Sequence, residues 1–243
     1  MLQIAEKTPA ASTSALCNPT LLDQPAFLMN VPFSLSAEVA NNVWMQEIDP
    51  DERTVDARRA INQFMQLYHF MASEAVVYLL PTPQKPGLQD LAYCANLGMV
   101  LDHLPGKDTV VLSRFCSEVR IPEEEVGLQF FQEMGYLVVQ SPHCFEGEAD
   151  LTHQHDDIYA GGYGIRSDKT AFKWMEEQFD MQVIALKESE PHLYHLDCTI
   201  FPLTREQTLV CTEMYSQREI QQLESVTGII DVTADECFSG ICN

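Results

Sequence analysis

The chain has 243 residues, 46% of them hydrophobic and 21% charged, a size and composition typical of a globular protein with one domain or two small ones. Its formal net charge of −22 argues against nucleic acid and anionic membrane surfaces as partners, because both bind clustered Lys and Arg. No apolar run approaches the roughly 18 residues of a membrane span, and no basic segment precedes an apolar one at the N-terminus. We therefore expect a cytoplasmic protein.

Cysteine usage supports the same expectation. The eight cysteines lie mostly in apolar, strand-like runs, and no two of them form a CxxC pair. We expect reduced thiols and no disulfide framework. The cysteines are Cys17, Cys94, Cys116, Cys144, Cys198, Cys211, Cys237 and Cys242.

Residues 1–24 are rich in Ala, Ser, Thr and Pro and lack periodicity, so they are predicted to form a flexible tail before a domain at 25–243. The first predicted elements are a strand at 26–30, a polar loop at 36–46, a helix from 51 to about 75 and a strand at 75–80.

The second half of the pattern begins with an apolar run at 91–101. It continues with a strand at 108–112, a helix at 123–134, strands at 136–140 and 157–160, a turn at 161–164, a helix at 169–179 and a strand at 181–186. The last elements are an apolar run at 195–203, a strand at 208–211, a helix at 217–224 and a strand at 229–232.

A strand, strand, helix, strand unit thus recurs every 45 to 55 residues or so, which indicates a repeat architecture. Each unit is too small to bury its own apolar face, so the units are expected to pack around an axis. A doubly wound parallel sheet would instead show simple strand–helix alternation.

Two polar clusters follow or open apolar runs. In the first, Glu146 and Glu148 alternate around Gly147, so a strand would present both on one face. In the second, His195 and Asp197 share a face by the same rule. Strand-end carboxylates beside a histidine suit a cationic substrate and general acid–base chemistry. The alternative is a core histidine satisfied by a carbonyl group.

Two further stretches have competing interpretations. His153 and His155 alternate beside two aspartates, which suits Zn²⁺, but a solvated turn between strands is the favoured interpretation. The stretch Gly161–Arg166 lacks the spacing of a nucleotide-binding loop, and a turn that carries Arg166 to the start of a helix is the simpler reading. In an otherwise acidic site, that arginine would hold a substrate carboxylate.

An ordered set of motifs resembles the guanidino-group-modifying superfamily, which contains arginine deiminases, dimethylarginine dimethylaminohydrolases, arginine dihydrolases and amidinotransferases. The motifs occur in family order over residues 26–243. They are Phe27-Leu-Met29, Asn42-Val-Trp-Met45, Ala95-Asn-Leu-Gly98, Phe145-Glu-Gly-Glu-Ala-Asp150, Gly162-Tyr-Gly-Ile-Arg166 and Tyr194-His-Leu-Asp197. The resemblance implies a five-bladed α/β propeller of ββαβ units, with the last blade incomplete in this chain.

The resemblance also implies a role for each matching residue. His195 would be the general acid–base and Glu146 its acidic partner. The substrate-binding residues would be Asp197, Arg166, Asn96, Asp150 and Asn42. The substrate would be arginine or a related guanidino compound, attacked by a cysteine thiolate without a metal or organic cofactor.

The chain departs from the family pattern at two places. Asn96 stands where arginine deiminases carry an aspartate, so one negative charge is missing around the guanidinium. The family cysteine follows the histidine by more residues than this chain has, which leaves Cys242 as a weak candidate beside Cys237, both also explicable as buried structural thiols.

Three functions follow from these observations. The first is a hydrolase of the guanidino group of arginine or a methylated arginine. The second is a non-catalytic arginine-binding or regulatory protein, or an amidinotransferase, of the same fold. The third is a metal-dependent hydrolase that uses His153 and His155. A homo-oligomer is compatible with all three.

Overall fold

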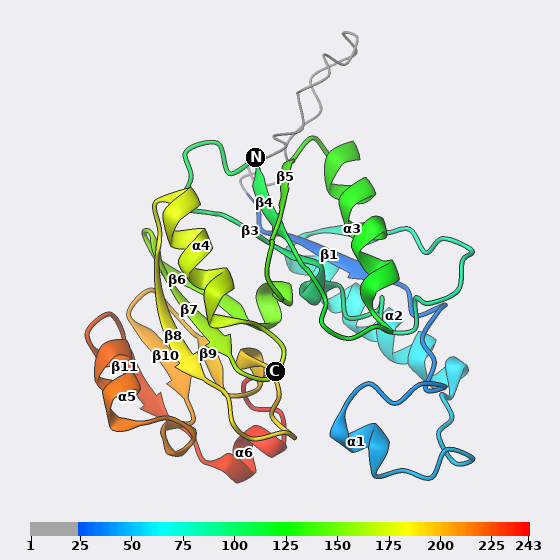
Figure 1. The fold of residues 1–243 in the computed structure, drawn as a ribbon. Coiled ribbons are helices and arrows are strands. Elements are labelled where there is room, and N and C mark those ends of the chain that lie inside the picture. The colour runs from blue at the N-terminus through cyan, green and yellow to red at the C-terminus, as the bar shows by residue number, and fades with distance from the viewer. Residues whose placement is uncertain (1–23) are drawn as a thin grey trace, which may run out of the picture.

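Four small β-sheets follow one another along the chain and give a mixed α/β fold (Figure 1). The computed structural model describes residues 24–243, so the predicted tail and Cys17 lie outside the described residues, apart from Gln24. The first sheet pairs β1 (Ala26–Asn30) in parallel with β2 (Val76–Leu80), and α2 (Ala57–Glu74) connects the two strands.

The other three sheets share one topology. In each, an antiparallel hairpin is followed by a helix and by a strand parallel to the second hairpin strand. The predicted strand, strand, helix, strand repeat is therefore confirmed in these units. They comprise β3 (Gly98–Val100), β4 (Thr109–Leu112), α3 (Ile121–Glu133) and β5 (Leu137–Gln140); β6 (Leu151–His155), β7 (Ile158–Tyr163), α4 (Lys169–Phe179) and β8 (Gln182–Lys187); and β9 (Ile200–Pro202), β10 (Gln207–Val210), α5 (Gln217–Glu224) and β11 (Gly228–Asp231).

Short helical turns occupy the connections. In the described part of the chain, two are α-helices, α1 (Val43–Gln46) and α6 (Ala234–Phe238), and four are 3₁₀ turns, η2 (Cys94–Leu97), η3 (Gly147–Ala149), η4 (Leu196–Cys198) and η5 (Thr212–Met214). No helix within residues 24–243 has the length and apolar character needed to cross a membrane.

Some predicted boundaries were wrong for local reasons. The first long helix begins at Ala57 and not near Asp51, because the Asp56 side chain caps it by accepting a hydrogen bond from Arg59 N at 3.0 Å. The predicted turn at Gly161–Gly164 is wrong as well, since β7 continues to Tyr163. Gly161 is needed for packing: a Cβ there would lie 2.8 Å from the Phe172 ring of α4.

The expectation of reduced cysteines is also wrong at one pair. Cys116 and Cys144 form a disulfide with their Cα atoms 5.6 Å apart. The two residues follow β4 and β5, which are parallel neighbours, so both chains leave the same edge of the sheet. The remaining described cysteines, Cys94, Cys198, Cys211, Cys237 and Cys242, are free thiols.

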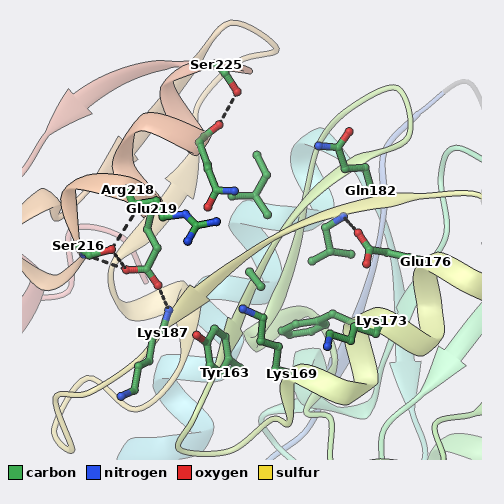
Figure 2. A pocket seen from close by; sticks show the side chains of 15 residues that line it. Tyr163, Lys169, Lys173, Glu176, Gln182, Lys187, Ser216, Arg218, Glu219 and Ser225 are labelled. Carbon is green, nitrogen blue, oxygen red and sulfur yellow. Dashed lines mark hydrogen bonds between the residues drawn. The ribbon is translucent and has the colours of Figure 1, made fainter.

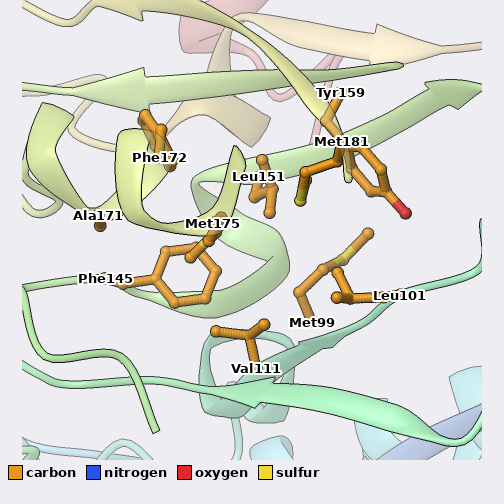
Figure 3. Packing of buried hydrophobic residues seen from close by; sticks show 10 residues of the cluster. All are labelled: Met99, Leu101, Val111, Phe145, Leu151, Tyr159, Ala171, Phe172, Met175 and Met181. Atoms are coloured by element: carbon orange, nitrogen blue, oxygen red, sulfur yellow. The ribbon is translucent and has the colours of Figure 1, made fainter. Parts of the chain in front are cut away.

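The largest apolar cluster joins the second sheet to the third and fixes the segment that carries the first polar cluster. Figure 3 shows Phe145 among Val111 and Met99 of one sheet and Met175 of α4. Phe145 is fully buried and lies directly before Glu146. Its packing, worth about 2 kcal/mol by the area it buries, therefore holds Glu146 at a defined place between the sheets.

Candidate functional site

A close approach of two 3₁₀ turns brings Asn96 and Glu146 together. Gly147 has φ +63°, and a Cβ on it would lie 2.5 Å from the carbonyl oxygen of Ala95. Only glycine permits this backbone contact. The side-chain amide of Asn96 consequently lies within 3.5 Å of the Glu146 carboxylate.

The predicted pairing of Glu146 with Glu148 on one face is wrong, because η3 interrupts the strand alternation. Glu146 is fully buried beside His195, whereas Glu148 lines a different, apolar cavity next to Asp102. His195 and Asp197 likewise do not share a strand, since His195 is extended and Asp197 lies in η4. Both nevertheless line one cleft.

Glu146 and His195 form the centre of the site. Their atoms Oε2 and Nε2 are 2.8 Å apart, and the exposed fraction of His195 is 8%. Asn96 lies beside the pair, where its amide nitrogen donates to the Tyr93 carbonyl at 3.1 Å and its amide oxygen accepts from Arg120 Nη1 at 3.2 Å. A carboxylate that orients an imidazole in this way is the arrangement of a general acid–base.

The charges of this pair stabilise each other. Burial alone would raise the pKa of Glu146, but the hydrogen bond to His195 and the charge of Arg166 hold that pKa below its usual range. Burial alone would lower the pKa of His195, but the charge of Asp150 and the hydrogen bond to Glu146 raise it. The pair therefore favours imidazolium and carboxylate.

A cleft of about 700 Å³ opens above this pair. Its walls combine an imidazole, an amide, carboxylates, guanidinium groups and phenol rings, contributed mainly by Asn96, His195, Asp197, Asp90, Arg120, Arg166, Tyr93 and Tyr194. Burial raises the pKa of Asp197. The volume and the convergence of polar groups are those of a site for a small polar molecule.

Arg166 lies between the buried acid and the open cleft. Its guanidinium is 3.4 Å from Glu146 Oε1, donates to the Asn41 carbonyl at 2.6 Å and stacks on the Tyr194 ring at 4.7 Å. The predicted position just before a helix is confirmed, because α4 begins three residues later. The stacking and the backbone hydrogen bond fix the guanidinium plane at the cleft wall.

Asp150 holds the segment that carries His195 in place. It is fully buried, accepts from the Ser167 hydroxyl at 2.5 Å and accepts from Leu196 N at 3.3 Å. It thereby ties η4, and with it His195, to the strand that follows Glu146. Burial raises the pKa of Asp150 to about 7. The residue does not line the cleft.

A loop over the cleft carries Asn42. Its amide nitrogen donates to the Tyr194 hydroxyl at 3.1 Å, and its side-chain oxygen caps α1. The next turn is held by Trp44, whose indole nitrogen donates to the His192 carbonyl at 2.9 Å. These contacts bridge about 150 residues of sequence and close one side of the cleft.

The cysteines differ in their relation to the cleft. Cys198 and Cys237 line it, whereas Cys242 does not. Cys237 and Cys242 are both buried and pack with Cys211 in one apolar cluster. Burial raises the pKa of Cys198 to about 12 and also raises that of Cys242. These thiols are therefore protonated at neutral pH.

The histidines of the metal interpretation bind the protein itself. His153 Nε2 lies 2.8 Å from the Asp156 carbonyl, and His155 Nε2 lies 3.0 Å from the Val226 carbonyl. Within residues 24–243 no group of three or more His, Cys, Asp or Glu side chains could hold a metal ion. Both histidines lie near the end of β6, and these hydrogen bonds to backbone carbonyls account for their positions.

Two charged residues of the cleft were missed from the sequence. Arg120 is 3% exposed, bonds Glu123 at 2.8 Å and lies 4.0 Å from Glu146. Asp90 accepts from the Asn41 amide at 2.7 Å. Neither residue lies in a motif, and both lie in connections between elements. Pro122 marks the first turn of α3, and Arg120 is the residue directly before that helix. This helix start is the one sequence signal near Arg120.

Comparison with known proteins gives relatives of one kind, although no family model matches the chain. The chain is 31% identical over 224 residues to the bifunctional arginine dihydrolase/ornithine cyclodeaminase AgrE of Nostoc sp., covering 89% of this chain and 30% of that protein. It is 26% identical to the N(G),N(G)-dimethylarginine dimethylaminohydrolase of Mycobacterium tuberculosis, covering 88% of this chain and 68% of that one. The chain thus spans about a third of the length of the bifunctional relative.

The solved structures agree with these relatives. The N-terminal domain of ArgZ, a cyanobacterial arginine dihydrolase crystallised with its substrate, superimposes with a TM-score of 0.81 at 26% identity, covering 90% of this chain and 79% of that domain. A variant of the same domain was solved covalently bound to a reaction intermediate.

Proposed function

We propose that this chain is a member of the guanidino-group-modifying superfamily, as its relatives indicate, and that it binds arginine or a methylated arginine and hydrolyses the guanidino group. The observation that carries the proposal is the buried Glu146–His195 pair at 2.8 Å, open to a cleft with further carboxylates. A planar cation offers paired N–H donors, and such carboxylates are its natural partners.

The proposed roles follow from the position of each group. Asp197 and Asn96 hold the guanidinium beside His195, and Arg166 holds the substrate's α-carboxylate. Asn42 covers the bound substrate from the loop, and Asp150 acts through η4 by positioning His195. The neutral amide of Asn96 forms hydrogen bonds without adding charge, so the carboxylates supply the electrostatic attraction.

The proposed chemistry needs a thiolate and two proton transfers. A cysteine sulfur attacks the central guanidino carbon, and His195 gives a proton to the departing amine. An S-amidino intermediate remains on the sulfur. His195 then takes a proton from water, which attacks the same carbon and releases the sulfur.

Cys242, Cys237 and Cys198 are the thiols to be tested as the nucleophile. Cys198 and Cys237 have the advantage of lining the cleft. Cys237 and Cys242 would both have to leave the apolar cluster that they share. Replacement of each by serine, in separate variants, identifies the nucleophile as the one whose loss abolishes the covalent adduct seen by intact-protein mass spectrometry.

A second function, arginine binding without turnover, is favoured by one specific observation. Burial raises the pKa of each of the three thiols, which opposes thiolate formation. In that case the cleft serves recognition, and the protein acts as an arginine-binding or regulatory member of the family.

One experiment separates the two functions. The protein is incubated with arginine, methylarginines and agmatine, while citrulline, ornithine and ammonia are followed and binding is measured by calorimetry. Turnover that His195→Ala abolishes and His69→Ala leaves intact supports hydrolysis, since His69 is exposed on α2. Arginine binding without product over hours supports the second function. Turnover that survives His195→Ala at the wild-type rate contradicts the proposed mechanism.

Three further expectations concern the fold, the oligomeric state and the location of the protein. A five-bladed α/β propeller over residues 25–243 is supported by the three ββαβ units, and homo-oligomerisation stays a prediction. The cytoplasmic location also stays a prediction, and the Cys116–Cys144 disulfide weighs against a strongly reducing compartment.

A further inference from the structure

A second cavity, separate from the cleft, lies between α4 and α5. Its volume is about 600 Å³, and strand β8 contributes Val183, Ile184 and Ala185 to its floor. It shares no lining residue with the cleft that contains His195. Figure 2 shows the two helices facing each other across this space, with polar side chains around the rim.

The charge of this cavity is opposite to that of the whole chain. The protein has 14 Lys and Arg residues against 36 Asp and Glu, yet four of the 14 line this one cavity. They are Lys169 and Lys173 of α4, Lys187 at the end of β8 and Arg218 of α5. Only two acids, Glu176 and Glu219, accompany them.

Both acids accept hydrogen bonds from backbone N–H groups. Glu176 accepts a hydrogen bond from Val183 N at 2.9 Å. Glu219 accepts from Lys187 N at 2.8 Å and from Ser216 N at 2.9 Å, where it completes a capping box at the start of α5. Their carboxylates therefore stabilise the helix and strand ends through hydrogen bonds, and Glu219 also feels the charge of Lys169. Two acids remain against four cations.

None of the four cations makes an ion pair with a carboxylate of residues 24–243; the salt bridges of this structure lie elsewhere. Lys169 rests on the Tyr163 ring, with its Nζ 4.7 Å from the ring centroid. In Figure 2 the Lys169 ammonium and the Arg218 guanidinium both point into the space between the helices, whereas the Lys187 ammonium points away.

From this arrangement we propose that the cavity between α4 and α5 binds a small phosphate-bearing anion. Lysine ammonium groups bind phosphate as point charges and an arginine adds a fork of donors, so the pair suits a ligand with several anionic oxygens. The volume fits a molecule of mononucleotide size. The charge of −22 on the whole chain repels a nucleic acid polymer but leaves a small ligand able to enter.

The test measures binding of pyrophosphate, AMP and ATP by calorimetry at low salt, with adenosine and citrate as comparisons. We expect binding of at least one phosphate compound and none of adenosine. The double variant Lys169→Ala/Arg218→Ala should weaken that binding about tenfold or more, because it removes two charge-assisted contacts to the phosphate. Arg58→Ala, an exposed arginine on α2, is the control for overall charge.

Three outcomes would overturn the proposal: no phosphate compound binds at millimolar concentration, citrate binds while the phosphates do not, or the double variant binds as well as Arg58→Ala. Both double-variant positions are exposed, so a thermal melt without ligand should match wild type. If the melt differs, Lys173→Ala, exposed on the same wall, provides the second variant. Arginine turnover plays no part in this readout, so the result is independent of the proposed function.

Discussion

The imidazole of His195 and the carboxylate of Glu146 are a buried pair whose stability should depend on pH. The pKa of His195 is raised in the folded protein, so its contribution is complete below the unfolded value of about 6.5 and is lost as pH rises through the folded pKa. The pKa of Glu146 is lowered, so its contribution is complete above about 4.3 and is lost as pH falls. The ion pair is therefore complete near pH 5.5.

The first prediction concerns Glu146→Gln. It should reduce the free energy of unfolding by about 3 kcal/mol near pH 5.5, the cost of removing one partner of a buried ion pair. The loss should be smaller near pH 9, because His195 loses its proton as pH rises through its raised pKa. Urea unfolding at both pH values measures the difference. Arg120 and Arg166 keep their charge throughout, so an equal loss at both pH values would show that these arginines, and not His195, carry the effect.

A second residue-scale prediction concerns Glu188. The residue is 6% exposed, and neither carboxylate oxygen has a hydrogen-bond partner among residues 24–243, while a Cβ on Gly162 would lie 2.6 Å from Oε1. Burial, together with the charge of Asp150, raises the pKa of Glu188 well above its ordinary value. The folded protein therefore holds Glu188 as a neutral acid, and ionisation opposes folding as pH rises.

Replacement of Glu188 by Gln should therefore stabilise the protein increasingly as pH rises above about 4.3, by about 1.4 kcal/mol for each unit of raised pKa. Chemical denaturation at about pH 5 and about pH 8 provides the measurement. Glu177→Gln, on the exposed face of α4, is the matched control and should show no such trend. A stability difference that stays constant with pH would mean that Glu188 is ionised in the folded state.

At the scale of elements, the contact between η2 and η3 determines where Asn96 and Glu146 meet. Gly147→Ala should lower the free energy of unfolding by about 1 kcal/mol for its positive φ and by roughly 1–3 kcal/mol more for the clash with Ala95 and Asn96. Gly240→Ala is the matched control: it also has positive φ, but a Cβ there meets its nearest atom at 3.7 Å.

Thermal unfolding of the two glycine variants, with arginine binding as a second readout, tests this prediction. We expect Gly147→Ala to lose more stability than Gly240→Ala and also to weaken arginine binding. Equal losses in the two variants would show that the 3₁₀ turns can separate without disturbing the site.

The elements that the sequence predicted best are those whose periodicity and packing agree. Helices 169–179 and 217–224 and the strand at 26–30 occur with the predicted bounds. In helix 169–179 the apolar spacing matches the buried face, which carries Ala171, Phe172 and Met175. The turn predicted at Gly161 was wrong. A glycine inside a strand can also allow a helix to pack closely against that strand, as Gly161 does for α4. Single-residue signals of this kind are ambiguous until the neighbouring element is known.

At the scale of the whole molecule, the site is assembled from distant segments, and sequence patterns reach only part of it. The motifs that contain Asn96, Glu146, Arg166 and His195 could be identified from the resemblance. Arg120 and the Cys116–Cys144 pair could not, because a lone arginine and two separated cysteines carry no period or spacing. Their positions follow from how the sheets pack, which local pattern does not determine.

The net charge of −22 makes the last prediction a property of the whole chain. Like charges repel one another in the compact state, and added salt screens that repulsion over a Debye length of about 10 Å at 0.1 M. The unfolding midpoint should therefore rise as NaCl increases from about 20 mM to about 300 mM. Choline chloride at equal ionic strength should act alike, since screening does not depend on the cation, whereas a rise with one salt alone would point to specific ion binding. A midpoint that falls would show that the buried pairs around Glu146, and not the surface charge, dominate the salt response.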